Sequence, residues 1–506
     1  MEIMIKSALI SVYNKDGLDE IIQMLHQLDV HIYSTGGTQT YIESFNIPVT
    51  PVEDITSYPS IMDGRVKTLH PKIFGGILAK RASSHFDDLI RYEIPAIDLV
   101  IVDLYPFMEA WTNMVSHDDM IEKIDIGGVS LIRAAAKNYN DVMVIPSKNA
   151  YSTLYSILKN QNGCSTLEQR KQLAIAAFGI TSEYDMLISN YLGGKERTYF
   201  KVISNGEKPL RYGENPHQKG SFYGNTDEIF EQLSGKELSY NNLVDIDAAL
   251  NIIHEFDNNK SVFAIIKHTN VCGIAESDTA GKSWEQALAG DSVSAFGGIL
   301  ISNAEIDMET AKKIDKIFYE VLIAPDFSSG VIELLSAKTN RILLKMKKRV
   351  PQIQMFRNLL NGVIVQEVDV ARNERSDFDV KTRIAPDERE INDLNFAVKC
   401  VKHLKSNAIV LVKNGQLCGM GCGQTSRVDA CRQAIDKAKH FGFDLHGAVM
   451  ASDAFFPFPD CVELVYNEGI RAVVQPGGSI KDQLSIDYCD EHGMSMVFTG
   501  IRHFKH

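Results

Sequence analysis

The segment SVFAIIKHTNVCG, residues 261–273, places a short apolar run directly before a lysine, a histidine and a polar turn. Val, Ile and Phe in such a run are typical of a buried β-strand. Lys267 and His268 would then lie together where the strand ends, and a general base beside a charged hydrogen-bond donor could act on one substrate there. A second basic cluster, RVKTLHP at residues 65–71, suggests a second reactive site elsewhere in the chain.

The same pattern returns further along the chain. FAIIKHTNVCGIA (263–275) is followed by a helical stretch and VSAFGG (293–298), and AIVLVKNGQLCGMGCG (408–423) is followed by a helical stretch and ASDAFFPF (451–458). Each copy has an apolar strand, a turn, a Cys-Gly step, a helix and a loop with phenylalanine. Two fused copies of one fold would explain the pattern, although strand-turn-helix units are common enough for coincidence.

Residues 1 to about 195 alternate short β-rich runs with amphipathic helical stretches. SALISVY (7–13) and DLVIVDLY (98–105) read as strands, and GLDEIIQMLHQL (17–28) and TQTYIESF (38–45) read as helices. This alternation predicts a parallel sheet flanked by helices.

Ligands of such sheets collect beyond the carboxyl ends of the strands. That rule selects five places in this region: residues 11–15, residues 34–38, residues 65–70, Tyr105 and the segment around Asp125.

A long helical stretch, residues 166–192, ends the first region at Gly193-Gly194. The polar stretch that follows, residues 195–218, contains Gly and Pro and reads as a linker and the start of a second unit. We therefore expect one domain over residues 1–195 and another over residues 200–506, both of the α/β class.

Composition excludes several classes of protein. The chain has 506 residues, a formal net charge of −13 and a pI near 5.6, which argues against a broad basic face for nucleic acid or anionic membrane. No apolar run approaches the roughly 20 residues needed to cross a bilayer. The first residues lack the pattern of a secretory signal. We expect a cytoplasmic protein whose eight cysteines are reduced thiols.

STGGT, residues 34–38, joins a strand to a helix through two glycines. Backbone amides and the positive end of the helix suit a phosphate at such a junction, but a Gly-containing turn with a Thr cap fits equally well.

IDIGGVSLIRAAAKN, residues 124–138, places Asp125 before two glycines and a helix that carries Lys137. Asp125 could be an ordinary N-cap and Lys137 an ordinary surface lysine. The company of Lys67 and Tyr105 at neighbouring strand ends favours a catalytic role instead.

Four segments of the second region carry further polar or aromatic groups. RYGENPHQ (211–218) offers anion or base contacts, although surface turn chemistry is the common alternative. SDAFFPFPD (452–460) holds three phenylalanines between acids, and we favour a grip on a flat ligand over a core pair. IRHFKH (501–506) is either a frayed basic tail or, less plausibly, a metal tract. KMKKR (345–349) reads as a solvated surface element.

A catalytic zinc is not expected. Cys418 and Cys422 are spaced C-x3-C with Cys431 beyond them, but the His-x-Glu and Pro-Cys-x-x-Cys segments of zinc deaminases are missing. No P-loop is present, so ATP hydrolysis is not suggested.

Taken together, the motifs resemble the bifunctional purine-biosynthesis family that joins AICAR transformylase to IMP cyclohydrolase. The resemblance covers nearly the whole chain in the family's order. It rests on RVKTLHP, DLYPF, KIDIGG, RAAAKN, RYGENPHQ, KHTN-CG, KSNAIVLVKNGQ, GCGQTSR, SDAFFPF and the terminal RHFKH.

The resemblance implies an α/β protein with two parts. The N-terminal IMP cyclohydrolase domain would have a methylglyoxal-synthase-like fold with a doubly wound parallel sheet. The C-terminal transformylase would be a pair of cytidine-deaminase-like α/β subdomains without zinc. The resemblance also implies a homodimer with transformylase sites at the interface, 10-formyltetrahydrofolate as cosubstrate and no tightly bound cofactor.

The resemblance also implies roles in formyl transfer. His268 would assist proton removal from the amine of AICAR, Lys267 would stabilise developing charge or protonate the leaving folate nitrogen, and Asn407 would donate to the formyl oxygen. The implied AICAR-binding residues are Arg211, Tyr212, Asn242, Gly297, Arg427, Phe455, Arg502 and His506, and the implied folate-binding residues are Asp460, Gln475 and Pro476.

For ring closure, the resemblance implies that Lys67, Tyr105, Asp125 and Lys137 orient groups and move protons. The implied nucleotide-binding residues are Ser11, Lys15, Ser34, Gly36, Gly37, Thr38, Arg65, Thr68, Gly127 and Gly128.

The chain departs from the family in a few places. Tyr13-Asn14 stands where the family often has Ser-Asp, Asp103 where it has Asn, and Pro459 where it has Arg. Asp103 adds negative charge near the first site, which puts nucleotide affinity there in doubt more than activity. Two other classes remain open at this point: a metal-dependent nucleobase deaminase, and a nucleotide-sensing module that would not need the proton-transfer groups.

Overall fold

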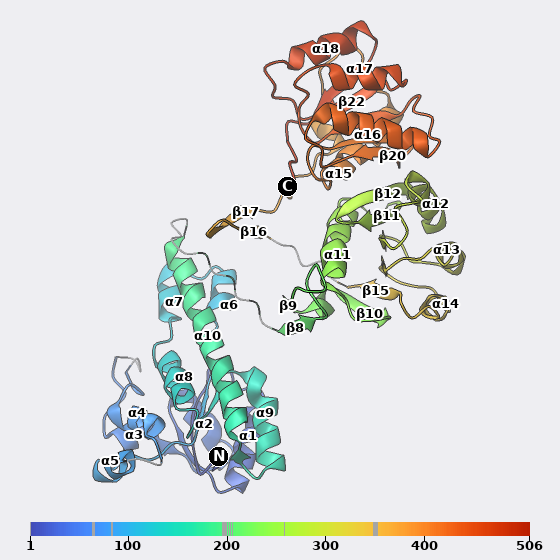
Figure 1. Cartoon of the computed structure of the whole chain (residues 1–506). Helices are drawn as coiled ribbons and strands as arrows, with labels where there is room; N and C mark the ends of the chain where they lie inside the picture. Colours follow the sequence, from blue (N-terminus) through green and yellow to red (C-terminus); the bar gives the residue numbers. More distant parts are fainter. Residues whose placement is uncertain are drawn as a thin grey trace. The chain divides into compact units, whose positions relative to one another are not determined.

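The computed structural model describes residues 2–62, 66–81, 84–194, 200, 202, 204, 206–257, 259–347 and 353–506. The chain divides into two compact units, Met1–Ile203 and Ser204–His506 (Figure 1). The division falls inside the stretch that the sequence marks as a linker. Each unit is described by itself.

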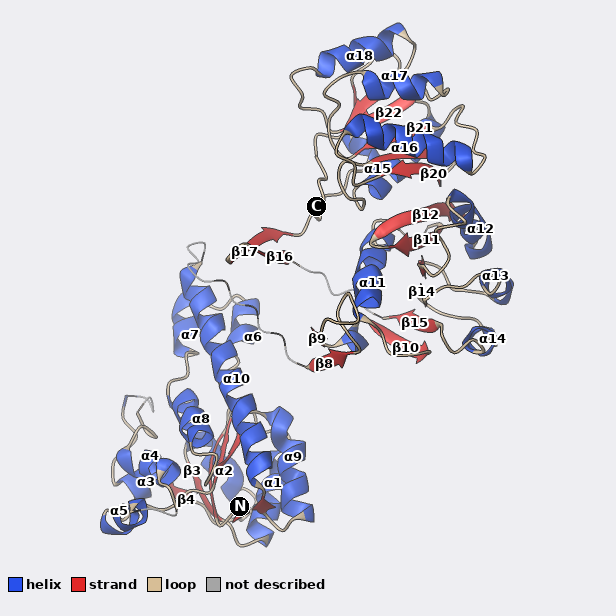
Figure 2. Ribbon diagram, viewed as in Figure 1, coloured by secondary structure: helices blue, strands red, loops and turns tan. Residues whose placement is uncertain are grey.

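Unit 1 is built on a five-stranded parallel sheet with helices around it (Figure 2). The strand order is β4 (Thr50–Pro51), β3 (His31–Ser34), β2 (Ser7–Ser11), β5 (Leu99–Val102) and β6 (Met143–Ile145). The sequence LVIV of β5 is wholly buried, as expected for a parallel strand covered on both faces. The predicted parallel sheet is confirmed.

Helices connect and cover these strands. They are α1 (Leu18–Gln27), α2 (Gly36–Glu43), α3 (Val52–Thr56), α4 (Pro71–Leu78), α5 (His85–Arg91), α6 (Phe107–Thr112), α7 (His117–Glu122), α8 (Gly127–Lys137), α9 (Tyr151–Asn160) and α10 (Leu167–Gly193). A capping box between Thr166 and Gln169 starts α10, and the helix ends at Gly193 as the sequence indicated. A two-stranded pair, β1 (Ile3–Met4) with β7 (Cys164–Ser165), lies outside the main sheet.

The strand order places a switch point at the middle of the unit 1 sheet. From β2 the chain goes to β3 on one side, and β5 pairs with β2 on the other. The carboxyl ends of these three strands therefore meet where α/β sheets bind their ligands.

Unit 2 is built on one mixed sheet. Its strand order is β10 (Phe230–Ser234), β15 (Ile342–Met346), β14 (Val321–Ala324), β13 (Ile299–Ser302), β11 (Ser261–Lys267), β12 (Asn270–Ser277), β20 (Gln416–Gly421), β19 (Ile409–Lys413), β21 (Val449–Ser452), β22 (Ala472–Gln475), β23 (Ser495–Phe498) and β18 (Asp379–Val380). Its helices are α11 (Tyr240–Ile253), α12 (Ala280–Gly290), α13 (Met308–Ile314), α14 (Val331–Ser336), α15 (Glu388–Val401), α16 (Arg427–His440), α17 (Asp460–Asn467) and α18 (Asp482–Glu491).

The two halves of the unit 2 sheet have the same order of helices and strands. In the first half α11 precedes the hairpin β11–β12, α12 follows it, and β13, β14 and β15 then run parallel. In the second half α15, the hairpin β19–β20, α16 and the parallel strands β21, β22 and β23 repeat that order. The two halves meet where β12 pairs with β20. The internal repeat seen in the sequence is thus a repeat of structure.

The Cys-Gly step of each repeat has a packing role. A Cβ atom on Gly273 would lie 2.0 Å from the carbonyl oxygen of Ala287 on α12, and one on Gly419 would lie 2.2 Å from that of Ala434 on α16. Glycine is therefore needed for each helix to approach its hairpin closely.

Two hairpins lie outside the large sheet. The pair β8 (Glu207–Leu210) with β9 (Gly220–Tyr223) begins inside the stretch expected as a linker. The pair β16 (Gln354–Leu359) with β17 (Gly362–Glu367) exposes every one of its strand residues.

The basic run at residues 345–349 is only partly a surface element. Lys345 belongs to β15 and pairs with Asp326 at 2.8 Å, while residues 348 and 349 lie outside the described part of the chain. Among the described residues, no helix is both long and apolar enough to cross a membrane.

Candidate active sites

The loop after β2 is organised by side chains from two neighbouring segments. Asp103, after β5, accepts hydrogen bonds from the backbone N–H groups of Tyr13 and Asn14. Thr38, on α2, donates to the carbonyl of Val12 at 2.9 Å and accepts from its N–H at 3.1 Å. The loop that carries Lys15 is therefore fixed from both sides before any ligand is bound.

The three hydroxyl groups of the STGGT segment differ in their hydrogen bonds. Ser34 is fully buried and donates to the carbonyl of Ile10 at 2.8 Å, and Thr38 is used as described above. Thr35, the N-cap residue of α2, has a buried hydroxyl with no hydrogen-bond partner in the described part of the chain. Gly36 and Gly37 are exposed at the start of the helix. Thr35 is thus a further anion-binding candidate that we did not single out from the motif.

The basic cluster seen in the sequence lies next to this helix start. A Cβ atom on Gly36 would lie 3.0 Å from the Nζ atom of Lys67, and one on Gly127 would lie 3.0 Å from the Oγ1 atom of Thr68. The segment of Lys67 and Thr68 therefore lies between the starts of α2 and α8. Arg65, the other predicted residue here, lies outside the described residues.

Asp125 lies just before α8 and is held at two points. Its Oδ1 atom accepts the N–H of Gly128 at 2.7 Å, so it contacts the first turn of α8 from the residue before Ile126, the N-cap residue of that helix. Its own N–H donates to the Tyr184 hydroxyl at 2.9 Å, and that hydroxyl donates to the carbonyl of Lys123 at 2.5 Å. Burial raises the pKa of the Asp125 carboxyl and Asp103 raises it further, against the opposing effects of Gly128 and Lys67.

Tyr105 lies beside the same group of charges. Its ring contacts the ring of Tyr13 edge-on at 5.5 Å, and the Nζ atom of Lys123 lies 5.8 Å from both ring centroids. Burial raises the pKa of Tyr105, and the negative charge of Asp125 adds to the shift. Burial also lowers the pKa of Lys15, with Asp103 opposing and Lys67 adding to that shift.

Lys137 is the one proposed catalytic residue of unit 1 that lies apart from this group. It is exposed in the last turn of α8, about 15 Å along the helix axis from Gly127. Within one unit it therefore lies at the other end of the helix from Asp125.

In unit 2, Lys267 and His268 lie where the sequence placed them, at the end of β11 and in the turn to β12. The ammonium group of Lys267 donates to the carbonyl of Phe296. A Cβ atom on Gly297 would lie 3.8 Å from the Nζ atom of Lys267. The backbone N–H of Thr269 donates to the Oδ1 atom of Asp245 at 2.7 Å.

Asn407 and Arg427 form a second cluster in unit 2. The Nη2 atom of Arg427 donates to the Oδ1 atom of Asn407 at 2.8 Å. Its Nη1 atom donates to Asp453, with which it forms a buried ion pair, and to the Ser452 hydroxyl at 2.9 Å. Arg427 is therefore held by three partners and orients the amide of Asn407.

The remaining predicted nucleotide residues differ in role. Asn242 is buried and forms a capping box with Ser239 at the start of α11. The guanidinium group of Arg211 lies 5.6 Å over the ring of Tyr212 in the loop before β9.

The expected grip of three phenylalanines on a flat ligand is wrong for Phe456. Its ring is fully buried in the core between the sheet and α16 and α17. Phe455 is half-buried, and Phe458 is exposed with the Nζ atom of Lys481 at 4.1 Å from its ring centroid. The core alternative therefore holds for one ring of the loop.

The predicted folate residues lie around this loop. Gln475 is buried, and its Oε1 atom accepts the N–H of Phe456 at 3.1 Å. Pro476 is buried, and the Oδ1 atom of Asp460 accepts the N–H of Cys461 at 2.8 Å at the start of α17.

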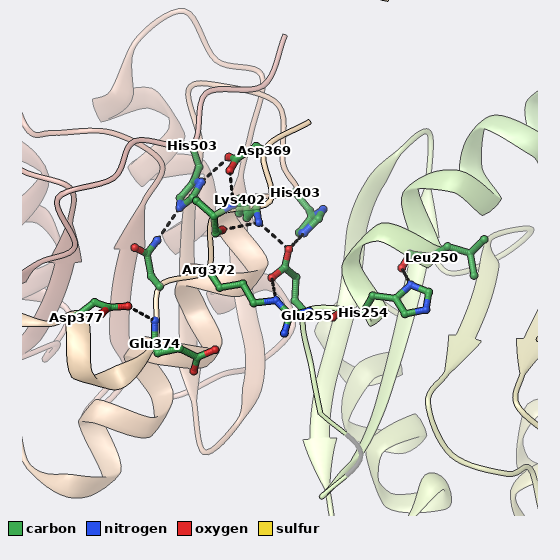
Figure 3. Close-up of polar contacts among 12 residues, drawn as sticks. Leu250, His254, Glu255, Asp369, Arg372, Glu374, Asp377, Lys402, His403 and His503 are labelled. Carbon is green, nitrogen blue, oxygen red and sulfur yellow. Dashed lines mark hydrogen bonds and ion pairs between the residues drawn. The ribbon is translucent and has the colours of Figure 1, made fainter. Parts of the chain in front are cut away.

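The C-terminal tail is docked rather than frayed, so that alternative is wrong. His503 is buried and lies beside Asp369, with 2.6 Å between its Nδ1 atom and the carboxylate (Figure 3). Ser406 donates its N–H to the carbonyl of Lys505 at 2.9 Å, and Lys505 returns its N–H to the Ser406 hydroxyl at 3.1 Å. The exposed Arg502 and His506 are thus carried on an anchored segment next to Asn407.

The chain is similar to known protein families and to several named proteins. Residues 17–130 match the MGS-like domain family, and residues 135–437 match the family described as AICARFT/IMPCHase bienzyme. A protein of Bacteroides thetaiotaomicron named bifunctional purine biosynthesis protein PurH is 56% identical over 503 residues, which cover 99% of each chain. This chain belongs to the AICARFT/IMPCHase bienzyme family.

Other relatives agree. Proteins with the same name from Chlorobium chlorochromatii and Thermoanaerobacter sp. are each 45% identical, over 519 and 514 residues that cover 99% of this chain and 99% and 100% of theirs. A solved structure titled "Crystal structure of ForH" covers 37% of this chain and 100% of its own at 29% identity, with a TM-score of 0.34, too low to bear on the fold.

The bienzyme catalyses the last two steps of IMP synthesis, formyl transfer to AICAR and ring closure to IMP. The predicted family, fold class and enzyme class are confirmed, and the deaminase and sensor alternatives are set aside. In the part of the chain that the structure describes, no group of three or more His, Cys, Asp or Glu side chains could hold a metal ion.

A buried ionic cluster joins the two halves of unit 2. Lys402 and His403, after α15, converge on the Oε1 atom of Glu255 at 2.8 and 3.1 Å (Figure 3). Burial alone would raise the pKa of Glu255, but the hydrogen bonds from His403 and Lys402 lower it to about 2. Because Glu255 follows α11 and Lys402 follows α15, the cluster ties the two halves of unit 2 together close to Asn407.

Proposed function

We propose that the two reactions are divided between the units, with ring closure in Met1–Ile203 and formyl transfer in Ser204–His506. Each unit gathers its own proton-transfer and anion-binding groups, which supports this division. In unit 1 they surround Asp125, and in unit 2 they occupy the His268 turn and the Arg427 cluster.

In formyl transfer, the amine nitrogen of AICAR bonds to the formyl carbon of 10-formyltetrahydrofolate as the carbon bond to the folate nitrogen breaks. One proton leaves the amine and one reaches the departing nitrogen. The amine lone pair is delocalised into the imidazole carboxamide, so attack needs a base, and we assign this role to His268. Lys267 stabilises the developing charge or protonates the folate nitrogen. Its bond to the Phe296 carbonyl fixes its position beforehand.

The pairing of Arg427 with Asn407 is the observation that carries the transformylase assignment. The amide nitrogen of Asn407 has two hydrogens, and one of them goes to the carbonyl of Gln424 at 3.0 Å. The second can donate to the formyl oxygen. The guanidinium of Arg427 withdraws charge from the other end of the amide and so strengthens that donor.

In ring closure, the carboxamide nitrogen attacks the formyl carbon of the same molecule, and the formyl oxygen leaves as water with one proton from the carboxamide nitrogen and one from the formamide nitrogen. The reacting groups are already joined, so the site has to orient them and move protons. We assign the acceptance of the carboxamide proton to Asp125, whose raised pKa supports this role, and assistance to the departing oxygen to Lys67 and Tyr105. The start of α2, with Gly36 and Gly37, would bind the phosphate.

The proposal includes a cytoplasmic homodimer in which a second copy completes the transformylase site. The exposed hairpin β16–β17 supports it, because an isolated two-stranded hairpin is marginally stable in water and both of its faces carry apolar residues. If the site is shared, mixing two inactive chains, His268→Ala and Asn407→Ala, should restore part of the formyl transfer. Mixed chains that exchange subunits but stay inactive would contradict a shared site.

The residue assignments are tested on the full chain with two assays, formyl transfer from 10-formyltetrahydrofolate to AICAR and cyclisation of formyl-AICAR. His268→Ala should lower formyl transfer by about 10³-fold and leave cyclisation intact, and Asp125→Asn should do the reverse. A variant that lowers both reactions equally, or neither, would contradict its assignment.

A further inference from the structure

The duplication in unit 2 offers an internal comparison for the turn that carries His268. In the first half, Lys267 pairs with Asn270 across the turn between β11 and β12. In the second half, Lys413 pairs with Gln416 across the turn between β19 and β20. The two lysines also bind alike, since Lys267 donates to the carbonyl of Phe296 and Lys413 to that of Asp444.

Both two-residue turns adopt the left-handed conformation. The φ angles are 52° and 64° for His268 and Thr269, and 53° and 68° for Asn414 and Gly415. Asn-Gly is the preferred sequence for such a hairpin turn, because both residues tolerate positive φ. Histidine enters this region more often than most residues, but a β-branched threonine at positive φ is an outlier, so the strain lies at Thr269. The active turn is therefore a strained version of a turn that the same chain also builds without strain.

An aspartate at the same helical position holds each turn. Asp245 and Asp393 are both the sixth residue of a 14-residue helix, α11 and α15 respectively. The carboxylate of Asp393 accepts the N–H groups of Asn414 and Gly415 at 2.8 and 2.7 Å. That of Asp245 accepts the N–H of Thr269 at 2.7 Å, and the backbone of His268 also acts to lower its pKa against the raising effect of burial.

The two aspartates differ in the cations near them. Asp393 pairs with Arg389 one helical turn before it, at 3.4 Å. The residue that corresponds to Arg389 in α11 is Asn241, and the ionisable side chains that act on Asp245 are those of Lys267 and His268. Asp393, whose turn carries no predicted catalytic residue, is thus paired with an arginine, whereas Asp245 faces Lys267 and His268.

We propose that Asp245 is a positioning residue for formyl transfer, which holds the strained His268–Thr269 turn so that the imidazole faces the substrate. This inference rests on the proposed role of His268. The carboxylate does not touch the substrate in this account. It acts by fixing the backbone from which His268 projects, and it opposes the tendency of a non-glycine turn to leave the left-handed region.

The test uses the full chain and compares Asp245→Ala with its counterpart Asp393→Ala. Asp245→Ala should lower kcat for formyl transfer by about 100-fold, the scale expected for a misplaced catalytic group, with KM for AICAR within about threefold and cyclisation unchanged. Asp393→Ala should lower the unfolding midpoint but leave formyl transfer within about twofold.

A rescue variant separates positioning from general stability. Thr269→Gly removes the strain at that position, so the double variant Asp245→Ala/Thr269→Gly should recover about tenfold in kcat over Asp245→Ala. Wild-type kcat in Asp245→Ala, an equal loss in Asp393→Ala, or no recovery in the double variant would each overturn the inference. His268→Ala measured alongside keeps the two claims apart: if that variant retains formyl transfer, the proposed function fails first.

Discussion

The guanidinium of Arg427, in the first turn of α16, donates to the amide oxygen of Asn407, 20 residues earlier in the chain and just before β19, at 2.8 Å. The same guanidinium forms a buried ion pair with Asp453, after β21. Three segments of the second half are thus joined through one side chain.

Arg427→Lys should therefore lower formyl transfer strongly. A lysine ammonium has no planar fork and cannot reach Asp453, Ser452 and Asn407 in the same geometry. We expect kcat/KM to fall by at least about 100-fold, the scale of losing a buried charge-assisted bond. Arg432→Lys, an exposed change on the same helix, is the control and should have little effect. Comparable losses in both variants would argue against a specific role of the Arg427 fork.

Tyr184→Phe tests how Asp125 is held. The tyrosine hydroxyl bridges the carbonyl of Lys123 and the N–H of Asp125, so its removal should loosen the turn before α8. We expect cyclisation to slow by about tenfold, with formyl transfer unchanged. Tyr191→Phe removes a hydroxyl that pairs with His117 in the same aromatic cluster, and it serves as the matched control. The prediction fails if both phenylalanine variants cyclise at the same rate.

Gly36→Ala should disturb the first site. Gly36 has a φ of +56°, and a Cβ atom there would lie 3.0 Å from the Lys67 Nζ atom. Backbone strain of about 1 kcal/mol and displacement of the ammonium should together lower cyclisation by tenfold or so. Gly179→Ala in α10, where a Cβ atom would have nothing within 4 Å, should leave cyclisation unchanged. The measurement is the cyclisation rate of both variants, and equal rates would contradict the prediction.

Glu255→Gln should make stability depend less on pH. The pKa of Glu255 is lowered from 4.5 to about 2 in the folded state, so its ion pairs stabilise the fold fully above about pH 4.5. That contribution is lost as the pH falls toward 2 and amounts to about 3 kcal/mol at neutral pH.

The measurement is the thermal midpoint of unit 2 for wild type and Glu255→Gln between pH 2 and pH 7. The difference should be largest above pH 4.5 and close to zero near pH 2. Glu388→Gln, which removes an exposed partner of Arg375, should show almost no difference at any pH. A gap between wild type and Glu255→Gln that stays constant with pH would rule out this reading of the cluster.

Much of the fold could be predicted because it depends on local pattern. The strands β2 and β11 and the long helix α10 follow from short apolar runs, helical periodicity and a capping box, which act between neighbouring residues. The repeat in unit 2 was visible because both copies kept the same order of strand, turn and helix.

The contacts that hold the sites could not be predicted in the same way. Asp245, Tyr184 and Asp453 have unremarkable sequence surroundings, and their roles come from bonds to residues 24, 59 and 26 positions away. Phe456 and Phe458 lie two residues apart in one loop, yet one is buried and the other exposed. Only the packing of that loop against the sheet distinguishes them.

The amino-acid sequence by itself determined the class of the fold, the internal repeat and the place of Lys267 and His268 at the end of a strand, since these depend on residue type and on interactions along a few neighbouring residues. The tertiary structure alone decided that the C-terminal tail is anchored by His503, that Arg427 orients Asn407 and that Asp245 holds the His268–Thr269 turn. Each of these is a hydrogen bond or ion pair between segments brought together by burial of the sheet, and its partner is chosen by distance in space.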